Sequence, residues 1–437
     1  MRFSASKILS LALAVLPLTS ASLEKRASKY DGYKVYQIDA VSANYTEIAA
    51  AVANIEAAVP LACAESHDHM DVAVSPTAER KLKSLGFKMN LLYADLGARI
   101  RSEGEIKPWK SARTAAIAAR QAPSLPAMSW FESYRRFEDH LTWLDDVQAA
   151  FPKNSQTFVA GKSFEGRDIK GIHLYGAQGP GKRPAVIWHA TVHAREWIAA
   201  PTVEYMTYKL VDGYLKGDSI AKGAIDKFDF YIMPVVNPDG FVYTHMNNRI
   251  WRKNRQSWPG YTCVGTDINR NWPHQWNVAG GASDNPCDGA FRGMRPGDAP
   301  ENKALVSHTL TVARAQGIKF FADFHSYAQM ILVPYGYDCK AKPKTLSRQL
   351  KLAGGVASAI KAVNRLKFKY GQTCKTVYQT SGMSMDWGYD VAGAELAWGY
   401  EMRPATEKDG GFAIPPSNIV PSGEEQWAGF KYLLAKW

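Results

Sequence analysis

The sequence predicts an α/β fold: a main domain with a central mixed, mainly parallel sheet flanked by helices, preceded by a small α+β unit. Three observations predict it. Apolar strand-like runs alternate with helical patterns from Ser129 to the C-terminus, as in a sheet covered by helices. A separate pattern of strand, helix, strand and helix runs from Tyr33 to about Arg101. The 437 residues are 46% hydrophobic and 22% charged, which is typical of a folded globular protein.

The chain begins with the features of a secretory signal peptide. Arg2 and Lys7 precede the apolar run Ile8–Leu18, and Thr19–Ala21 supplies small residues for cleavage. This run is too short to span a membrane, and no other stretch of the sequence is long and apolar enough to do so. We therefore expect residues 1–21 to be a signal peptide and the protein to be secreted and extracellular, where disulfides are permitted.

The small unit that follows has two expected strands and two expected helices. Tyr33–Ile38 alternates with the period of a strand, and Met70–Val74 is a second short strand. Tyr45–Ala58 is rich in alanine, and Pro76–Leu85 begins a helix with proline in its first turn. The one glycosylation sequon that we find begins at Asn44, so a glycoprotein is expected.

A segment rich in alanine, arginine and proline, Ser111–Ala127, separates this unit from the main domain. Arg113 and Arg120 offer exposed-looking cleavage points to an activating protease. An ordinary interdomain linker could have a similar composition. The signal peptide, the small domain and the basic connector together favour a zymogen, with an activation propeptide at residues 22–120 and a mature catalytic domain at residues 121–437.

The main domain is expected to alternate helices and strands along its whole length. Asn237–Gly240 has the composition of a strong turn. In chain order the expected elements are a helix at Trp130–Phe151, paired strands at Phe158–Ala160 and Ile169–Leu174, a strand at Ala185–Trp188, a helix at Ala199–Gly213, a strand at Phe228–Val236, a helix at Pro300–Gln316, a strand at Phe320–Phe324, a helix at Ser347–Ala362, a strand at Ala394–Met402 and a helix at Gly423–Lys436. Ligands of such sheets gather at the carboxyl ends of the strands.

Metal-ligand residue types directly follow two of these strands. His193 and Glu196 are three residues apart and could reach one metal ion if the chain turned sharply between them. Two ligands do not make a stable zinc site, and the best third candidate is His325, at the end of another apolar run. Two histidines and a glutamate with an open fourth position form a catalytic zinc arrangement. Each residue alone is more often structural, but the three together predict zinc. Asp267 could accept a hydrogen bond from a ligand histidine and fix its tautomer.

The formal net charge of +12 counts the signal peptide and any segment that is removed later. The basic run Arg249–Arg255 could contact nucleic acid, but a secreted protein seldom meets nucleic acid, and no helix-turn-helix or zinc-finger pattern accompanies the run. Anion capture in a pocket and a solvated surface loop remain as interpretations. We expect neither a nucleic acid nor a membrane as a partner.

The five cysteines fit disulfides better than a metal site. None has C-x-x-C spacing, which argues against a cysteine zinc site. Sequence alone does not fix their connectivity. Local pairing of Cys263 with Cys287 and of Cys339 with Cys374 is the simplest arrangement, and it leaves Cys63 over.

Six motifs resemble those of the secreted zinc metallocarboxypeptidases of the carboxypeptidase A type, which are made as preproenzymes. The motifs are HAREW at 193–197, WRKNR at 251–255, DINRNW at 267–272, FHSY at 324–327, VYQTSGMSMDWGY at 377–389 and WGYEMRP at 398–404. They span nearly all of the chain from residue 129 onward, in family order, and the small unit resembles the family's open-sandwich activation domain more loosely. The resemblance implies a monomeric hydrolase with one zinc ion per chain, which cuts the C-terminal peptide bond of peptides and proteins.

The resemblance also implies a role for each residue that matches a motif position. Glu401 matches the general base that activates the zinc-bound water. Arg255 matches the residue that stabilises the oxyanion formed at the scissile carbonyl. Asn269, Arg270 and Tyr378 match the residues that hold the terminal carboxylate of the substrate, a task that suits a planar guanidinium.

Further matches concern the cleft and the specificity pocket. Arg195 and Tyr327 match residues that line the cleft beyond the scissile bond. Met385 stands where members that prefer basic residues carry an aspartate, and a buried, unpaired Lys or Arg would be costly there. The resemblance therefore implies a preference for apolar or aromatic C-terminal residues. Gly399 stands where many relatives carry a small hydroxyl residue, so we expect extra room for bulky aromatics.

Three other functions fit less well. A catalytically silent member of the family would lack the base or the oxyanion arginine, but Glu401 and Arg255 are present. An amidase or deacylase with the same fold would not need a carboxylate clamp. A basic-residue carboxypeptidase would carry an acidic residue at Met385.

Overall fold

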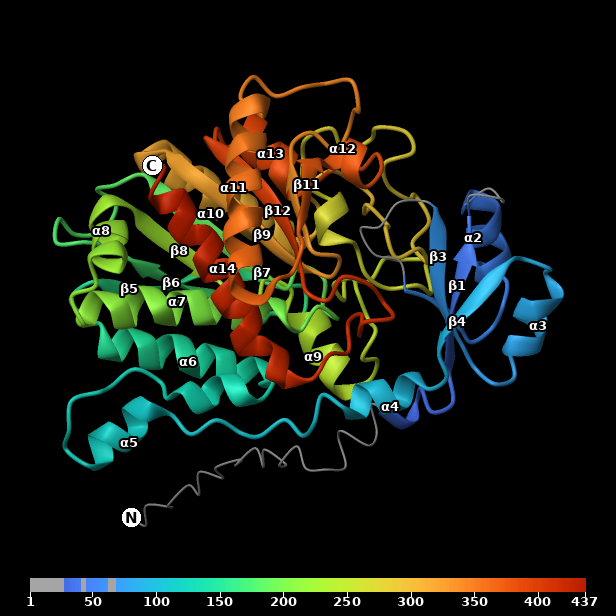
Figure 1. The fold of residues 1–437 in the computed structure, drawn as a ribbon, viewed down its shortest axis with the longest axis horizontal. Coiled ribbons are helices and arrows are strands. Elements are labelled where there is room, and N and C mark those ends of the chain that lie inside the picture. Colours follow the sequence, from blue (N-terminus) through green and yellow to red (C-terminus); the bar gives the residue numbers. More distant parts are fainter. Residues whose placement is uncertain (1–26, 41–44, 62–67) are drawn as a thin grey trace, which may run out of the picture.

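The computed structural model describes residues 27–40, 45–61 and 68–437. The expected signal peptide, Asn44 and Cys63 lie outside these residues. A small N-terminal unit lies beside a larger main domain, and the connector between them runs along the main domain from α4 to α5 (Figure 1). Within the described residues, no helix combines the length and the apolar character that crossing a membrane would need.

The small unit is an antiparallel sheet covered by two helices. Its strand order is β2-β3-β1-β4. Helices α2 and α3 share a hydrophobic cluster with the sheet, formed by residues such as Ile48, Leu82 and Val72. The elements are β1 (Lys34–Asp39), α2 (Tyr45–Ala53), β2 (Ala58–Pro60), β3 (His69–Val74), α3 (Glu79–Ser84), β4 (Met89–Tyr93) and α4 (Leu96–Arg101). The expected α+β character is confirmed, although β2 and β4 were not predicted.

The main domain has an eight-stranded mixed sheet with the order β11-β10-β12-β9-β7-β8-β6-β5. The pairs β10–β11, β12–β9, β9–β7 and β7–β8 are parallel, and the other three pairs are antiparallel. The strands are β5 (Ser155–Lys162), β6 (Asp168–Leu174), β7 (Ala185–Ala190), β8 (Asp229–Met233), β9 (Ile318–Ser326), β10 (Met330–Val333), β11 (Lys369–Gln372) and β12 (Leu396–Met402). The predicted mixed, mainly parallel sheet is confirmed.

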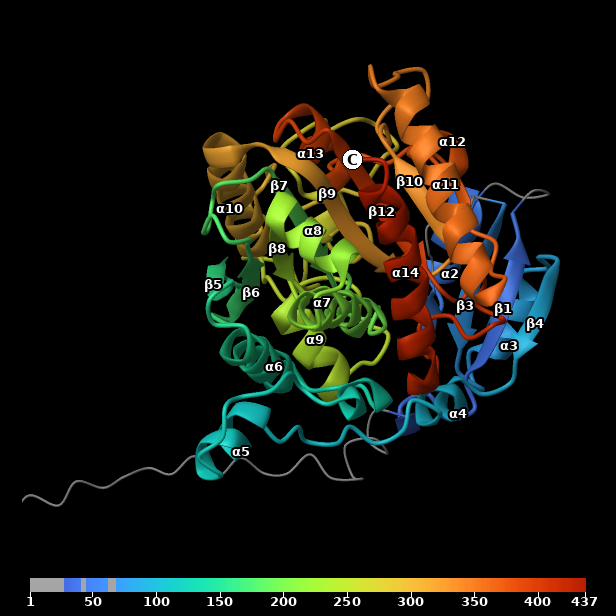
Figure 2. The same ribbon diagram turned by 60° about the vertical axis from the view of Figure 1, so that its left-hand side comes forward.

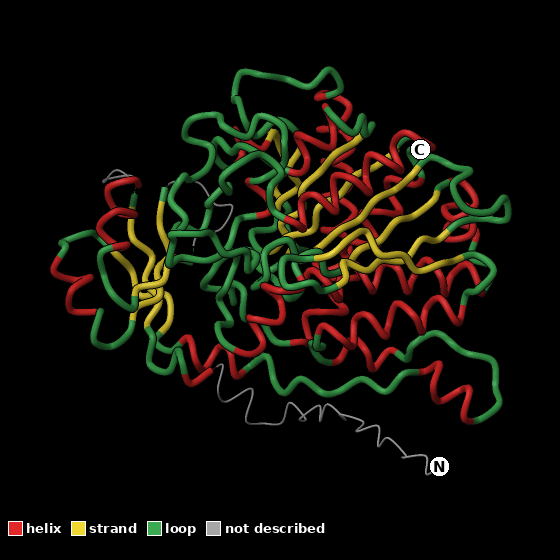
Figure 3. The backbone as a smooth tube through the Cα atoms, turned by 180° about the vertical axis from the view of Figure 1, so that it is seen from behind, coloured by secondary structure: helices red, strands yellow, loops and turns green. Residues whose placement is uncertain are grey.

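Helices cover both faces of this sheet (Figure 1 and Figure 2). Helices α6, α7, α8, α11 and α14 pack on the face that carries Phe320 and Phe324, and α10 and α13 pack on the face that carries Phe321. Seen from behind in Figure 3, loops occupy most of the region between the two sheets. The helices are α5 (Ala112–Ala118), α6 (Phe137–Ala150), α7 (Ala199–Leu215), α8 (Ser219–Lys227), α9 (Pro238–Met246), α10 (Pro300–Gln316), α11 (Leu346–Asn364), α12 (Thr373–Thr376), α13 (Ser384–Asp390) and α14 (Ile419–Leu434).

Two expected elements of the main domain take a different form, and β10, β11, α8, α12 and α13 were not predicted. The helix expected over Trp130–Phe151 is a short 3-10 helix, Met128–Glu132, followed by α6. The expected turn at Asn237–Gly240 is the start of α9 instead, because the Asn237 side chain accepts a hydrogen bond from the Gly240 N–H and Pro238 occupies the first turn. Asparagine at the N-cap and proline at the next position favour a helix start as much as a turn.

Candidate metal centre and substrate cleft

His193, Glu196 and His325 converge at the carboxyl ends of β7 and β9. The chain leaves β7 through Thr191, whose φ of 59° provides the sharp turn. The Nδ1 atom of His325 lies 3.1 Å from Nδ1 of His193 and 3.0 Å from Oε2 of Glu196, and Oε1 of Glu196 lies 2.7 Å from Nδ1 of His193. All three side chains are buried. These residues, expected from sequence to meet, therefore do meet.

The arrangement fits a zinc ion. Two imidazole Nδ1 lone pairs that face each other in a buried site repel unless a cation lies between them. Zinc–nitrogen distances of about 2.0–2.1 Å with tetrahedral angles place two ligand nitrogens roughly 3.3 Å apart, close to the 3.1 Å observed. Two histidines and one carboxylate also leave the fourth position open, as in catalytic zinc sites.

Carboxylates on the far side of each imidazole fix the tautomer that metal binding needs. Nε2 of His193 lies 3.1 Å from Oδ1 of Asp267, and Nε2 of His325 lies 2.9 Å from Oδ2 of Asp323. With the protons held on Nε2, both Nδ1 atoms are free to bind a metal. Asp267 was expected from sequence. Asp323 was missed, although residues two apart in a strand share a face.

The carboxylates of the centre are held in their charged form. Burial acts to raise the pKa of Glu196, but His193 and His325 outweigh it and lower the pKa to about 2. Burial likewise opposes ionisation of Asp267, yet Arg252 and His193 hold its pKa well below the usual value. Both groups therefore carry negative charge at any physiological pH.

Glu401 lies next to this group on β12, where it is the register partner of His325 on β9. Burial, with a further contribution from Glu196, raises its pKa well above the usual value. Its Oε2 atom is buried and accepts no hydrogen bond from any described residue. A carboxylate with a raised pKa and an unused oxygen beside a metal centre is suited to proton transfer.

Of the two arginines in the motif, Arg252 contacts the carboxylates of the centre, and the oxyanion role expected for Arg255 stays a prediction. The Arg252 guanidinium donates to Oδ2 of Asp267 from Nη2 at 2.9 Å, and its Nη1 lies 4.0 Å from Oε1 of Glu196. Arg255 instead stacks on the rings of Tyr243 and Trp251, 3.7 and 4.6 Å from their centroids. Both arginines occur in one short motif, and the tertiary structure decides which one faces Asp267.

Asn269, Arg270 and Tyr378 come together as a group. Nη2 of Arg270 donates to the Tyr378 hydroxyl at 3.3 Å, and Nη1 donates to the Asn269 carbonyl at 2.9 Å. The Nε atom of Arg270 is buried without a partner among the described residues. Nδ2 of Asn269 is 3.2 Å from Nε2 of His325. Amide, guanidinium and phenol donors therefore lie next to the metal centre, where they could bind a carboxylate.

Arg195 and Tyr327 lie together around the Phe412 ring. The Arg195 guanidinium is 4.0 Å from the centroid of the Phe412 ring, and the Tyr327 ring packs edge-on against the same ring at 4.9 Å. Glu407 lies close to both side chains, and burial raises its pKa. Phe412 and Glu407 were not singled out from the sequence, because neither has a metal-ligand spacing or a motif around it.

Met385 fills the space beside Gly399, which corrects the expected extra room. A Cβ atom at Gly399 would lie 2.6 Å from Cε of Met385. Across from it, a Cβ at Gly336 would lie 2.2 Å from the Thr380 hydroxyl and 3.0 Å from Sδ of Met383. The two glycines thus make space for methionine and threonine side chains. The space beside Gly399 is therefore filled by Met385 and does not widen the pocket for a substrate side chain.

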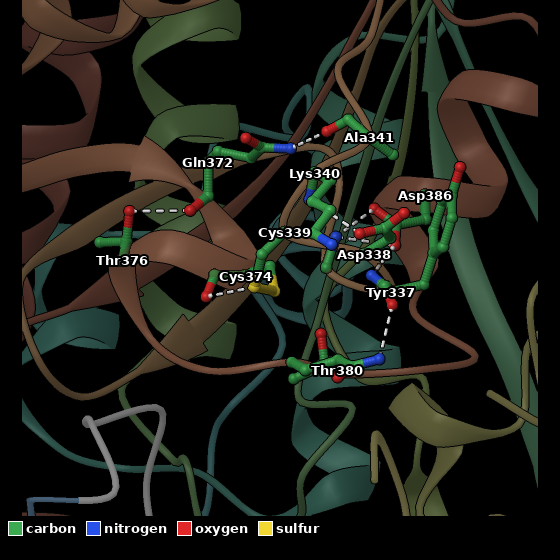
Figure 4. Close-up of a disulfide and its surroundings, with 12 residues drawn as sticks. Tyr337, Asp338, Cys339, Lys340, Ala341, Gln372, Cys374, Thr376, Thr380 and Asp386 are labelled. Atoms are coloured by element: carbon green, nitrogen blue, oxygen red, sulfur yellow. Dashed lines mark hydrogen bonds between the residues drawn. A yellow bond between two sulfur atoms is a disulfide. The ribbon is translucent and has the colours of Figure 1, made fainter. Parts of the chain in front are cut away.

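A disulfide secures this wall. Cys339 is bonded to Cys374, and Cys263 to Cys287, so both expected pairs are confirmed. In Figure 4 the Cys339–Cys374 bridge lies beside Thr380 and Asp386. Oδ2 of Asp386 accepts hydrogen bonds from the N–H groups of Gly336 and Tyr337 at 2.9 and 3.2 Å. The loop after β10 and the segment after β11 are therefore held together around Met385.

Known proteins share both the sequence pattern and the fold. A profile of the family described as zinc carboxypeptidase matches residues 140–429. Metallocarboxypeptidase A of Trichophyton rubrum is 37% identical over 429 residues, which is 98% of this chain and 98% of that one. The crystal structure of carboxypeptidase A from Helicoverpa armigera has a TM-score of 0.76 and 28% identity, and covers 93% of this chain and 97% of its own. That of thrombin activatable fibrinolysis inhibitor has a TM-score of 0.79, covers 93% and 99%, and at 24% identity is a likeness of fold.

Proposed function

The chain belongs to the zinc carboxypeptidase family and is a hydrolase of peptides, and from that premise we propose that it is a secreted exopeptidase, made as a zymogen, that removes apolar or aromatic residues from free C-termini. The observation that carries the proposal is the meeting of His193, Glu196 and His325 beside Glu401. All of these groups come from one chain, so we propose that the enzyme acts as a monomer.

The residues around the metal divide the reaction between them. When bound by His193, Glu196 and His325, zinc lowers the pKa of a bound water and polarises a carbonyl oxygen. Glu401 takes the proton of the attacking water and passes it to the leaving amine. Its buried carboxylate suits this task because burial raises its pKa and makes it a stronger base. An arginine of the WRKNR motif stabilises the negative charge that develops on the scissile carbonyl. Arg255 is the residue that matches the family position, and Arg252 is a second candidate because its guanidinium faces the centre.

The group formed by Asn269, Arg270 and Tyr378 selects a free C-terminus. Its donors lie next to the metal centre, so a carboxylate bound there places the last peptide bond at the zinc. The Met383 and Met385 side chains belong to one apolar cluster with Tyr378 and form an apolar wall beside this group. Such a wall favours an apolar side chain, and the flexible methionines adapt to its shape.

The small unit covers the cleft in the zymogen. Glu103 and Arg249 form an ion pair in which both side chains are fully buried, with Nε of Arg249 2.8 Å from Oε1 of Glu103. Arg249 also donates to the Arg195 carbonyl at 2.7 Å, so the pair touches a cleft residue. On the other side, Tyr45 is a neighbour of Tyr378, which contributes after burial to raising the pKa of Tyr45. The contacts of Glu103 and Tyr45 thus support the proposal that residues 22–120 are an inhibitory propeptide.

Cleavage after Arg120 fits the structure better than cleavage after Arg113. The N–H of Arg113 is hydrogen-bonded to Oδ1 of Asp146 at 3.2 Å within the first turn of α5. Arg120 is exposed and follows the end of α5. Since proteases cut exposed, non-helical segments, the mature protein is expected to begin at Gln121. Arg120→Gln should block activation and Arg113→Gln should not, as read by N-terminal sequencing of the secreted product.

Peptides that differ only in the last residue test the function directly. The activated enzyme should release Phe, Leu and Met, should leave Lys and Arg, and should stop when a chelator removes the zinc. A peptide with an amidated C-terminus should resist cleavage because it lacks the carboxylate. Met385→Asp should move cleavage towards Lys and Arg. Rapid cleavage of the amidated peptide, or chelator-resistant activity, would contradict the proposal.

A further inference from the structure

Asp323 is a fully buried carboxylate in the middle of β9 with three polar side chains around it. Its Oδ2 atom lies 2.9 Å from Nε2 of His325 and accepts a hydrogen bond from the Ser384 hydroxyl at 2.6 Å. Its Oδ1 atom lies 3.3 Å from Nε2 of His189. A buried carboxylate with three polar neighbours on three different elements is costly to assemble unless its contacts serve the fold or the site.

Strand register explains why these groups meet. Asp323 and His189 are partners in the parallel pair β9–β7, and Asp323 and Gly399 are partners in the pair β9–β12. Asp323 and His325 are two residues apart in one strand and therefore point to the same face. Because Gly399 has no side chain, Met385 at the start of α13 packs directly onto this face beside Asp323.

Ser384 links this face to the substrate groups. Its hydroxyl bonds to Asp323, and its backbone N–H donates to Oδ1 of Asn269 at 2.9 Å. Met383 and Met385 flank Ser384 in the chain. Through these contacts, Ser384 connects three parts of the site: His325 by way of Asp323, the side-chain amide of Asn269, and the methionine wall.

The His325 tautomer and the orientation of the Asn269 amide are consistent with these contacts. The His325 tautomer with a free Nδ1 has its proton on Nε2, which donates to Asp323. Nδ2 of Asn269, 3.2 Å from the same Nε2, faces another donor and so makes no hydrogen bond to it. Since Oδ1 of Asn269 accepts from Ser384, its NH2 group is left for a ligand. Both side chains are thus oriented by contacts that start from Asp323 and Ser384.

We propose that Asp323 is a positioning residue, which orients His325 for the metal and, through Ser384, sets the position of Asn269 and the methionine wall relative to that metal. The inference rests on the proposed function and adds a physical link between zinc binding and recognition of the C-terminal residue. A carboxylate behind a ligand histidine strengthens metal binding by fixing the ring and raising its basicity.

Zinc affinity of the full chain tests the first half of the proposal. In a competition with a chromogenic chelator, Asp323→Asn should raise the zinc Kd about 10- to 100-fold, the usual effect of losing such a partner. Asp229→Asn is the matched control, because Asp229 is also fully buried and lies 3.1 Å from Nε2 of His173 on the same sheet. The control should lower Tm and leave the zinc Kd unchanged. Equal zinc Kd values for Asp323→Asn and Asp229→Asn would overturn the proposal.

Ser384→Ala tests the second half and keeps the question open to experiment if Asp323→Asn does not fold. After activation, the variant should raise KM for a peptide substrate about 5- to 10-fold, on the order expected for the loss of one typical hydrogen bond, with a smaller effect on kcat. Ser384→Thr, which keeps the hydroxyl, should restore KM. An unchanged KM in Ser384→Ala would overturn the link. A wild-type chain that neither binds zinc nor cleaves peptides would instead overturn the proposed function.

Discussion

The metal centre and the interface with the small unit both bury charged side chains, but they balance the charge differently. At the interface one carboxylate, Glu103, meets one guanidinium, Arg249, whose other donors bond to backbone carbonyls. At the metal centre four carboxylates lie around the two candidate ligand histidines, with two guanidinium groups, those of Arg252 and Arg270, beside them; the carboxylates are Glu196, Asp267, Asp323 and Glu401. The first cluster is complete by itself, whereas the second holds excess negative charge that a divalent cation offsets. Charge imbalance, more than burial, marks the site.

The largest effect on activity is expected at Glu401, the carboxylate of the centre that is not one of the three candidate metal ligands. Glu401→Gln removes the base but keeps the shape of the side chain, so kcat should fall about 10²- to 10⁴-fold. Zinc content, measured by atomic absorption, should stay near one ion per chain because the three ligand side chains are intact. Full turnover in this variant would remove Glu401 from the mechanism.

The next largest effect on activity is expected at the arginines of the WRKNR motif, Arg252 and Arg255. Arg252→Ala should lower kcat about 10²- to 10³-fold, the usual cost of losing one oxyanion donor. Arg255→Ala serves as the control, because its side chain stacks on Tyr243 and Trp251 away from the carboxylates. Steady-state kinetics of both variants decide between them, and a larger loss in Arg255→Ala would support the assignment made from the sequence.

Removing the negative charge of Glu103 should destabilise the interface between the small unit and the main domain. Glu103→Gln leaves Arg249 buried without its counter-ion, which costs about 3–5 kcal/mol. The small unit should then dissociate more easily, and the uncleaved chain should gain peptidase activity. Glu56→Gln is a suitable control, because Glu56 is an exposed carboxylate of the same small unit. A silent, fully inhibited Glu103→Gln zymogen would contradict the role of this pair.

The smallest effect concerns pH and Asp386 in the wall of the cleft. Burial raises the pKa of Asp386 to about 7, well above the 3.8 of a free aspartate, despite hydrogen bonds from Gly336 and Tyr337. A raised pKa stabilises the fold below about pH 4, and this contribution is lost as pH rises through 7. Between pH 4 and 7 the Tm of the wild type should therefore fall relative to that of Asp386→Asn by a few degrees. A Tm difference that does not change over this interval would show that Asp386 does not titrate there.

The sequence by itself determined the fold class and singled out the three candidate metal ligands, because each depends on short-range patterns. Apolar runs with the strand period and helical stretches between them specify layers, and His193, Glu196 and His325 each follow or end such a run. Local spacing also sufficed for the two disulfides.

Only the tertiary structure decided which neighbours these residues have. Arg252 and Arg255 lie in one motif, and long-range contacts with Asp267 on one side and Tyr243 on the other separate their environments. Likewise, Gly399 read alone predicted a wider cavity, but Met385 from another element occupies the space. Strand register places Glu401 of β12 beside His325 of β9, a proximity that neither segment specifies by itself, since side chains on adjacent strands meet through pairing far apart in the chain.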